Sequence, residues 1–102
     1  MIIYNVTCSV DLSIGNEWLE WMREKHIPDV MKCGIFKKAR LHKVLSEKEK
    51  SVTYCIQYYC LSMKHLHKYQ VRFASKLQDH HIKKYGSKVI AFRTLLEELD
   101  SF

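Results

Sequence analysis

The order in which hydrophobic periodicities follow one another along the chain constrains its fold more than any other feature. Residues 2–10 alternate between apolar and polar side chains, which is typical of a half-buried strand. Strand-like segments recur at 35–46, 51–60 and 87–96, and helical spacing follows the first and the third strand. The order β-α-β-β-α-β predicts an α+β, ferredoxin-like domain over residues 1–102, with one four-stranded antiparallel sheet and two helices on one face.

The first predicted helix carries a proline near its end. Its buried face is predicted from four residues at helical spacing: Ile14, Trp18, Trp21 and Met22. Pro28 cannot donate a hydrogen bond to the carbonyl of Glu24, and its ring crowds that carbonyl, at a cost of about 3 kcal/mol in a straight helix. We therefore expect a break at Pro28, a short turn over residues 28–33 and a stop at Gly34.

The second predicted helix is longer and contains no proline. Ser62 is a suitable N-cap and Gly86 a suitable end. Its inward face is predicted from residues three or four positions apart: Leu66, Tyr69, Phe73, Leu77 and His80 or His81. Between the second and third strands, the polar residues 46–51 are expected to form a hairpin tip.

The face of the sheet away from the helices cannot be wholly polar. The last strand has apolar residues on one side at Val89, Ala91 and Leu95, and on the other at Ile90, Phe92 and Leu96. An apolar sheet face needs a cover, and a second copy of the chain would supply one through a two-fold interface. We therefore predict a homodimer packed sheet to sheet.

Composition and charge indicate the cellular compartment of the protein and whether it contacts a membrane. The net charge is +6, but the basic residues are interspersed with acidic ones, which indicates a solvated surface. No apolar run approaches the ~20 residues of a membrane span. The first residues do not resemble a signal peptide. We therefore expect a cytoplasmic protein with no membrane contact and four reduced cysteines.

His26 is the candidate catalytic residue, because it lies at the edge of the buried stripe and beside the predicted break. In one interpretation, its imidazole satisfies a backbone group that the break leaves free, such as the carbonyl of Glu24. In the other, it is a general base or a ligand-orienting donor at the mouth of a pocket between the first helix and the sheet. The sequence leaves both open.

The other candidate ligand-binding residues are aromatic or apolar. They flank His26 in the first helix or share the helix-facing side of the first and third strands: Tyr4, Trp18, Trp21, Met22, Tyr54 and Tyr58. Tryptophan and methionine stripes usually pack in a core, whereas the tyrosines offer hydroxyl groups. Together they are typical of a largely apolar cleft with a few polar groups.

Several kinds of site are not supported by the sequence. Paired histidines and cysteines are spaced so that their side chains diverge, as in His65 and His67, His80 and His81, and Cys55 and Cys60. No Cys-x-x-Cys motif, glycine-rich phosphate loop or nucleophile elbow occurs. We therefore expect no metal and no cofactor.

Nucleic acid is the rival partner, because the RNA-recognition motif has the same element order. That motif displays aromatic residues beside glycines on its third strand, and residues 51–58 contain no glycine. Tyr54 and Tyr58 share a face with Ile56, which indicates packing rather than display. Phosphate contacts from the basic second helix remain as an alternative, and they would be independent of sequence.

A set of short blocks spread along the chain forms a recognisable pattern. The blocks are Ile3-Tyr-Asn-Val-Thr7, Glu17-Trp-Leu-Glu-Trp-Met22, His26-Ile-Pro28, Gly34-Ile-Phe36, Ala39-Arg-Leu41, Val52-Thr-Tyr54, Gln57-Tyr58 and Ala91-Phe-Arg-Thr94. They resemble a family of short bacterial proteins classed as a domain of unknown function, within the dimeric α/β barrels. Relatives there include antibiotic-biosynthesis monooxygenase-like and stress-responsive proteins. The resemblance implies a fold and dimerisation but no activity.

Three functions remain open. The first is binding of a small apolar or aromatic molecule between the first helix and the sheet. If the protein is an enzyme, the superfamily suggests cofactor-free oxygenation or isomerisation, with His26 as base and Tyr4 or Tyr58 as hydrogen-bond donor. The second is a structural or regulatory module without catalysis, and the third is non-specific association with nucleic acid.

Overall fold

The computed structural model describes residues 1–46 and 48–102. The predicted hairpin tip at 46–51 therefore includes one position, residue 47, that lies outside the described residues. The regular elements are β1 (Ile2–Asp11), α1 (Gly15–Trp21), α2 (Ile27–Met31), β2 (Lys38–Lys43), β3 (Ser51–Cys60), α3 (Met63–Tyr69), α4 (Ser75–Tyr85) and β4 (Val89–Glu97).

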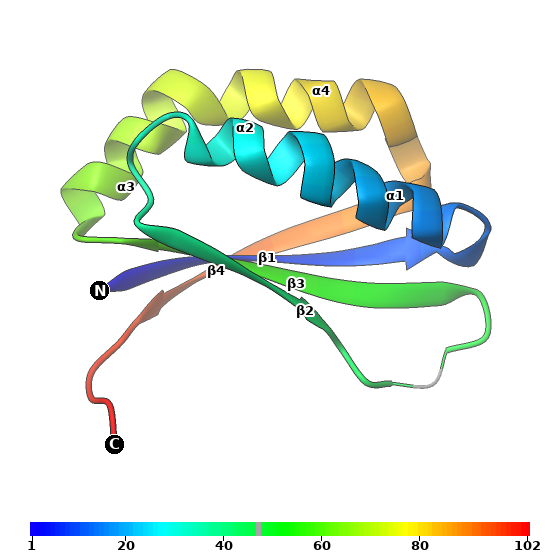
Figure 1. Cartoon of the computed structure of the whole chain (residues 1–102), viewed down its shortest axis with the longest axis horizontal. Coiled ribbons are helices and arrows are strands. Elements are labelled where there is room, and N and C mark those ends of the chain that lie inside the picture. The colour runs from blue at the N-terminus through cyan, green and yellow to red at the C-terminus, as the bar shows by residue number, and fades with distance from the viewer. Residues whose placement is uncertain (47) are drawn as a thin grey trace.

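The four strands form one antiparallel sheet in the order β2-β3-β1-β4. The helices form a second layer over one face, and the other face is open (Figure 1). The predicted ferredoxin-like fold is therefore confirmed. The register places Tyr4 of β1 between Tyr58 of β3 and Leu95 of β4, so these three side chains point to the helix side.

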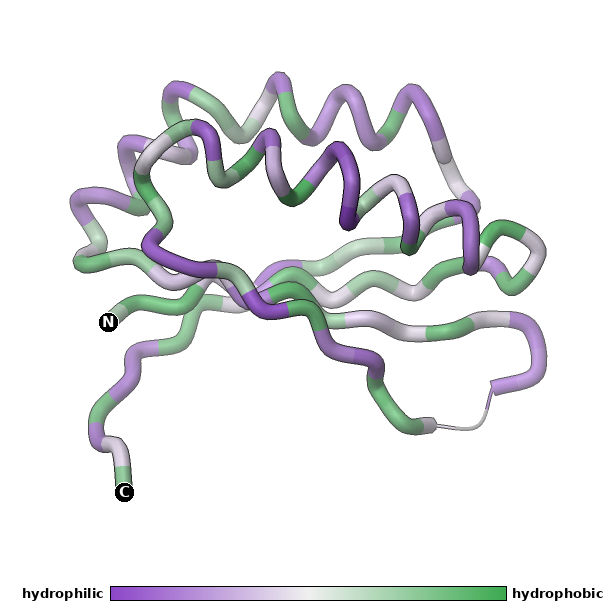
Figure 2. Tube along the Cα trace, in the orientation of Figure 1, coloured by the Kyte–Doolittle hydropathy of each residue, from purple (hydrophilic) through white to green (hydrophobic). Residues whose placement is uncertain are grey.

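The core lies between the helices and the sheet, where apolar segments of the two layers face each other (Figure 2). Trp18, Ile56 and Leu66 are completely or almost completely buried there. Burying side chains of this size contributes roughly 1.5–3 kcal/mol each. The helix-facing side of the sheet is thus occupied over most of its length.

The predicted break at Pro28 is wrong, because the helix continues through it. A π-helical turn, Met22–His26, joins α1 to α2 with helical backbone angles throughout. The N–H of Ile27 donates to the carbonyl of Met22, five residues back. This wider turn accommodates one extra residue. The hydrogen bonds beside Pro28 therefore already depart from the α-helical pattern at the point where Pro28 has no N–H to donate. The helix bulges instead of breaking.

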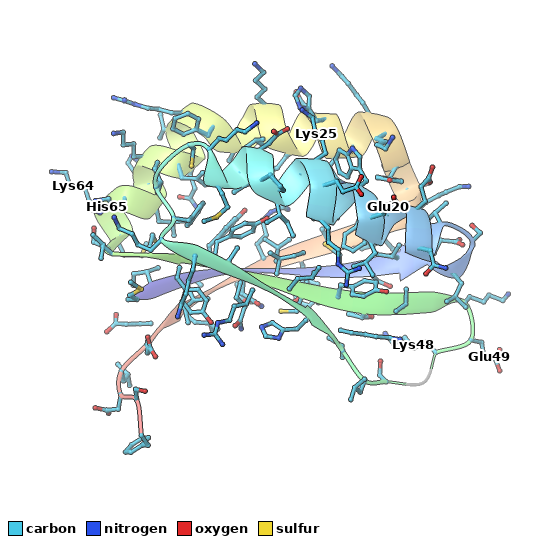
Figure 3. The ribbon with its side chains drawn as sticks, in the orientation of Figure 1. Glu20, Lys25, Lys48, Glu49, Lys64 and His65 are labelled. Carbon is cyan, nitrogen blue, oxygen red and sulfur yellow. The ribbon has the colours of Figure 1, made fainter. Side chains whose placement is uncertain are left out.

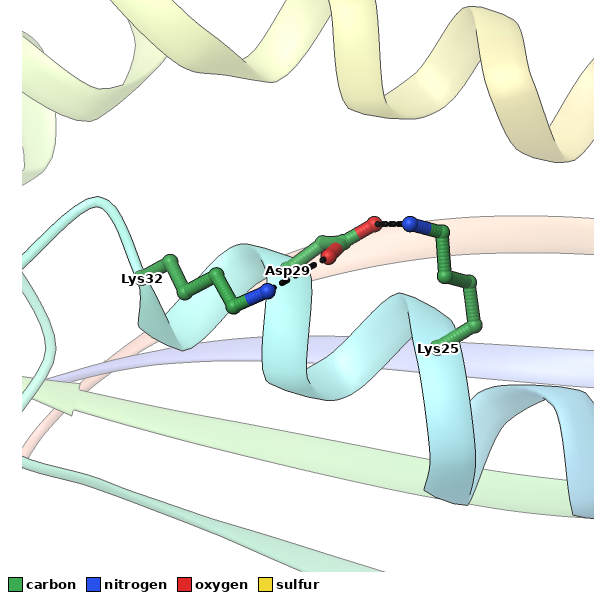
Figure 4. A network of polar contacts seen from close by, with 3 residues as sticks. All are labelled: Lys25, Asp29 and Lys32. Carbon is green, nitrogen blue, oxygen red and sulfur yellow. Dashed lines mark ion pairs between the residues drawn. The ribbon is translucent and has the colours of Figure 1, made fainter.

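An ion-pair network lies on the solvent side just beyond this turn (Figure 4). The Asp29 carboxylate pairs with the Lys25 ammonium at 3.1 Å and with the Lys32 ammonium at 3.7 Å. Both lysines are well exposed, so the pairs contribute only a few tenths of a kcal/mol each. They link residues on either side of Pro28 along one helical face.

The second helix contains a π-helical turn that the sequence did not reveal. The turn, Gln70–Ala74, joins α3 to α4. The predicted N-cap is confirmed, since the Ser62 side chain accepts from the N–H of His65. The predicted end is confirmed as well: Gly86 has φ of 56°, a conformation that favours glycine.

The extra residue of this turn changes which residues of the second helix face inward. After Tyr69, the next fully buried residue is Ala74, five positions on, whereas Phe73 is only half-buried. From Ala74, steps of four, three and four residues bring Gln78, His81 and Tyr85 to the side that faces the first helix and the sheet. Phe73 and Leu77, both predicted on the inward face, are for this reason only partly buried, although they still pack against the core.

The second strand is shorter than its predicted range, 35–46. Ile35 and Phe36 precede β2 and are both buried. Successive residues of a paired strand point to opposite faces, so two neighbours that both enter the core must lie in a loop. The Phe36 ring packs against Tyr58 and Tyr69, with centroids 5.1 and 4.8 Å away. The last strand likewise begins later than predicted, after a short helical turn, Gly86–Lys88.

The open face of the sheet is uneven in character. Its centre is polar, with Asn5 of β1 bonded to Thr94 of β4 and to the thiol of Cys55 in β3. Along β4 it is apolar, where Ile90 and Phe92 are more than half exposed. The predicted two-sided character of the last strand is confirmed by these exposures.

Candidate functional site

A cavity of about 200 Å³ lies between the two helices and the sheet. Its apolar wall comes from both layers: Val6, Met22, Val30, Ile56, Leu77, Ile82, Val89 and Ala91. Its polar groups come from all the surrounding elements: Tyr4, Cys8, His26, Tyr58, Tyr69, Gln78, His81 and Arg93. A small, mostly apolar space with a few converging polar groups is the usual form of a small-molecule site.

Four of the seven predicted site residues line this cavity. They are Tyr4, Met22, His26 and Tyr58. The strand residues reach it because their parity places them on the helix side of the sheet. Met22 and His26 reach it because they begin and end the π-helical turn, whose wider winding keeps residues four apart in line.

The other three predicted site residues lie behind the cavity wall. Trp18 is completely buried and stacks on Tyr54, with ring centroids 5.3 Å apart. Trp21 is half-buried and packs against Tyr85 at 5.5 Å. None of the three lines the cavity. They act as packing residues that support the wall.

A hydrogen bond fixes the protonation of His81. The Nε1–H of Trp18 donates to Nε2 of His81 over 2.9 Å. An indole nitrogen can only donate, so this ring nitrogen of His81 carries no proton here. Burial, and then the charge of Arg93, lowers the pKa of His81. The imidazole is therefore neutral at pH 7, with its remaining proton on Nδ1.

His26 is also neutral. Its ring lies 5.2 Å from the ring of Trp21 and 5.8 Å from that of His81. Burial is the main cause that lowers its pKa to about 4, and the neighbouring His81 adds to the effect, whereas Asp29 opposes it. The ring stands in an aromatic cluster at the cavity wall.

The phenols in the cavity keep their protons. Burial raises the pKa of Tyr58 and of Tyr69, and each is raised further by neighbouring phenols. Burial also raises the pKa of Tyr4, although Arg93 and hydrogen bonds from Arg93 and Gln78 act in the opposite direction. These hydroxyl groups can therefore donate hydrogen bonds to a ligand at neutral pH.

The cavity thiol is unreactive for the same physical reason. Burial raises the pKa of Cys8 to about 12. A thiol with so high a pKa is not a nucleophile at neutral pH. Within residues 1–46 and 48–102, no three histidine, cysteine or acidic side chains come close enough together to hold a metal ion.

The match to a protein family covers nearly the whole chain. The model of a domain of unknown function, DUF4286, matches residues 1–99. The chain belongs to the DUF4286 family. This confirms the resemblance seen in the sequence blocks. A search of proteins with curated functions gives no match to this DUF4286 chain.

Solved structures share the fold of this DUF4286 protein at low sequence identity. An ethyl tert-butyl ether d (ethd) family protein from Bacillus halodurans is 15% identical, with a TM-score of 0.70 over 97% of this chain and 100% of that one. A proposed antibiotic biosynthesis monooxygenase from Deinococcus radiodurans is 12% identical, with a TM-score of 0.68 over 100% and 96%. A dimeric ferredoxin-like protein from an uncultured marine organism is 8% identical, with a TM-score of 0.70 over 99% and 97%.

Five polar residues of the cavity in this DUF4286 protein were not among the predicted site residues: Cys8, Tyr69, Gln78, His81 and Arg93. Tyr69 and His81 were predicted on the inward face of the second helix but not assigned to the site, whereas Gln78 reaches the cavity because of the unforeseen π-helical turn. Arg93 was detectable in principle. It shares strand parity with Ala91 and Leu95, so it is a charged residue on the side that otherwise faces the helices.

The basic residues of the second helix lie outside the cavity. Lys64, His67, Lys68 and Arg72 are exposed on the outer surface of α3 and its π-helical turn, beside the half-buried His65. Lys64 and His65 are at the start of that helix, away from the first helix, on which Glu20 and Lys25 lie (Figure 3). Tyr54 and Tyr58 are buried, so they are not displayed for stacking on bases. Among the described residues, no helix is both long and apolar enough to cross a bilayer.

Proposed function

We propose that this DUF4286 protein binds a compact, largely apolar small molecule in the cavity between its helices and its sheet. The observation that carries the proposal is the cavity itself, about 200 Å³ in volume, with neutral donors and acceptors and one arginine, Arg93, set in an apolar wall. An apolar cavity of about 150 Å³ is enough to bind benzene. The space therefore suits one aromatic ring with a substituent.

The protonation of the cavity favours binding over base catalysis. A general base works best when its pKa lies near the working pH. The pKa of His26 is about 4, so its imidazole is a weak proton acceptor at pH 7. Cys8 is protonated and the phenols are neutral. These groups orient a ligand by hydrogen bonding, and Tyr4 and Tyr58 are among the hydroxyl donors of the cavity.

The working form that we propose is a cytoplasmic homodimer. The four cysteines are free thiols, which fits a reducing compartment. The exposed apolar side chains of β4 on the open sheet face need a cover. A ferredoxin-like protein of similar fold is dimeric. Two copies packed sheet to sheet would leave the cavities on the outer, helical sides.

Filling the cavity tests the binding function. Phenol is a suitable neutral probe, and its binding can be followed by NMR titration. We expect Ala91→Leu, which adds volume inside the cavity, to weaken phenol binding at least about tenfold. Ala39→Leu is the matched control, because Ala39 also faces the helices but lines a separate hollow beside β2. Equal phenol binding by both variants would refute the cavity as the site.

A further inference from the structure

Arg93 occupies an unusual position in the sheet. In β4 it faces the helices and lies opposite Val6 of β1, between Ala91 and Leu95 on the same side. It is the one cavity-lining residue that carries a full charge at neutral pH among those described, because His26 and His81 are neutral. A charged group next to an apolar space is costly unless it has a partner or water.

The described part of the chain supplies no carboxylate to Arg93. The ion pairs found in residues 1–46 and 48–102 both belong to Asp29, which pairs with Lys25 and Lys32. Asp79 lines a neighbouring outer hollow together with Arg93 but makes no ion pair with it. The guanidinium keeps its hydration through its exposed part, and the donors that it does not direct at Tyr4 remain available to a ligand.

Arg93 stands where the cavity meets the surface. The inner cavity and the outer hollow, which lies between the second helix and β4, share four residues: Tyr4, Gln78, Ile82 and Arg93. These residues form the junction between the two spaces. Three of them carry hydrogen-bond donors, namely a guanidinium, an amide and a phenol. The interior beyond the junction is apolar apart from neutral rings and hydroxyl groups.

We propose that the ligand of this cavity is a small aromatic carboxylate, with its carboxylate on Arg93 at the junction and its ring inside the cavity. The inference rests on the proposed binding function and adds the chemical class of the ligand. A guanidinium matches a carboxylate with two parallel hydrogen bonds. Gln78 and Tyr4 supply further donors to the same oxygens. A single arginine balances a single negative charge.

The test compares two probes of nearly equal shape, benzoate and benzamide, by calorimetric or NMR titration at pH 7. Charge-assisted hydrogen bonds favour the anion, so we expect benzoate to bind at least about tenfold more tightly. Arg93→Gln should remove that preference, and Arg93→Lys should keep part of it. Arg72→Gln is the control, because Arg72 lies on the outer surface of the second helix, away from the junction.

The titrations test the carboxylate assignment and the binding function separately. If both probes bind equally and Ala91→Leu blocks both, the carboxylate assignment is wrong, whereas binding in the cavity stands. If benzoate keeps its advantage in Arg93→Gln, Arg93 is not its partner and the inference is overturned. If neither these probes nor phenol binds the folded protein, the inference and the proposed function are both wrong.

Discussion

At the scale of single residues, the two cavity histidines show how burial and geometry set chemistry. The hydrogen bond from Trp18 holds His81 in one tautomer, and the aromatic surroundings keep His26 uncharged. Neither effect is visible in the amino-acid types alone, because each depends on a residue distant in the chain. Trp18 and His81, for example, are 63 positions apart.

The lowered pKa of His26 predicts a pH dependence of stability. Its pKa falls from an unfolded value of about 6.5 to about 4 on folding, so the unfolded chain binds the proton more readily. This contribution to stability is full above pH 6.5 and is lost as the pH falls toward 4. The difference amounts to at most about 3 kcal/mol.

Denaturant unfolding at pH 7 and pH 4.5 measures this effect. In His26→Phe, which keeps an aromatic ring in the cluster, we expect a smaller loss of unfolding free energy between the two pH values than in the wild type. His67→Phe is the control, because His67 is exposed on the outer side of α3. An identical pH dependence in the wild type and in His26→Phe would contradict the assigned shift.

At the scale of elements, the order and type of helices and strands followed from the sequence, whereas the two π-helical turns did not. Alternation and helical spacing are local patterns, so they predicted β1, β3 and the sheet from residues such as Tyr4 and Ile56. A surplus residue in a helix leaves no such pattern. Its place depends on which side chains pack against the sheet, and that is a tertiary effect.

The same distinction explains which parts of the candidate site were predicted. Tyr4, Met22, His26 and Tyr58 were found because strand parity and the first helical stripe are local. Gln78 was missed because the inward face of the second helix changes after Tyr69, whereas Tyr69 and His81 were predicted on that face without being assigned to the site. Arg93 was missed because the prediction for its strand was based on the apolar residues alone, and not on the charged side chain between them.

The π-helical turn of the second helix gives a prediction about deletions. Removing Val71, an exposed residue within the turn, would convert the turn to α-helix and leave Ala74, Gln78 and His81 facing inward. We expect a folded protein with an unfolding free energy within about 1 kcal/mol of the wild type. Denaturant titration followed by circular dichroism measures it.

A deletion elsewhere in the same helix provides the control. Lys83 is also exposed, but it lies beyond His81, so its removal would rotate Tyr85 away from the aromatic cluster and displace Gly86. We expect this variant to be clearly less stable than the one that lacks Val71. The reverse order of stability would show that the turn does not absorb the extra residue.

At the scale of the whole molecule, the proposed homodimer has the open face of the sheet as its interface. A homodimer through this face predicts that Phe92→Asp, which places a charge among the apolar side chains of β4, dissociates the protein. Analytical ultracentrifugation at micromolar concentration should show a wild-type dimer and a variant monomer. Val71→Asp is the matched control, because Val71 is similarly exposed but lies on the helical side. A wild-type monomer would end the dimer proposal.

The extra residue in each helix also has a consequence for how the lining of such a cavity changes during evolution. A π-helical turn marks a place where the gain or loss of one codon is absorbed within a single turn, so the strands and loops keep their positions. If such a turn moves along its helix, different side chains enter the cavity while the sheet stays as it is. The scaffold can therefore acquire a new ligand preference by a shift of one residue, without passing through an unfolded ancestor.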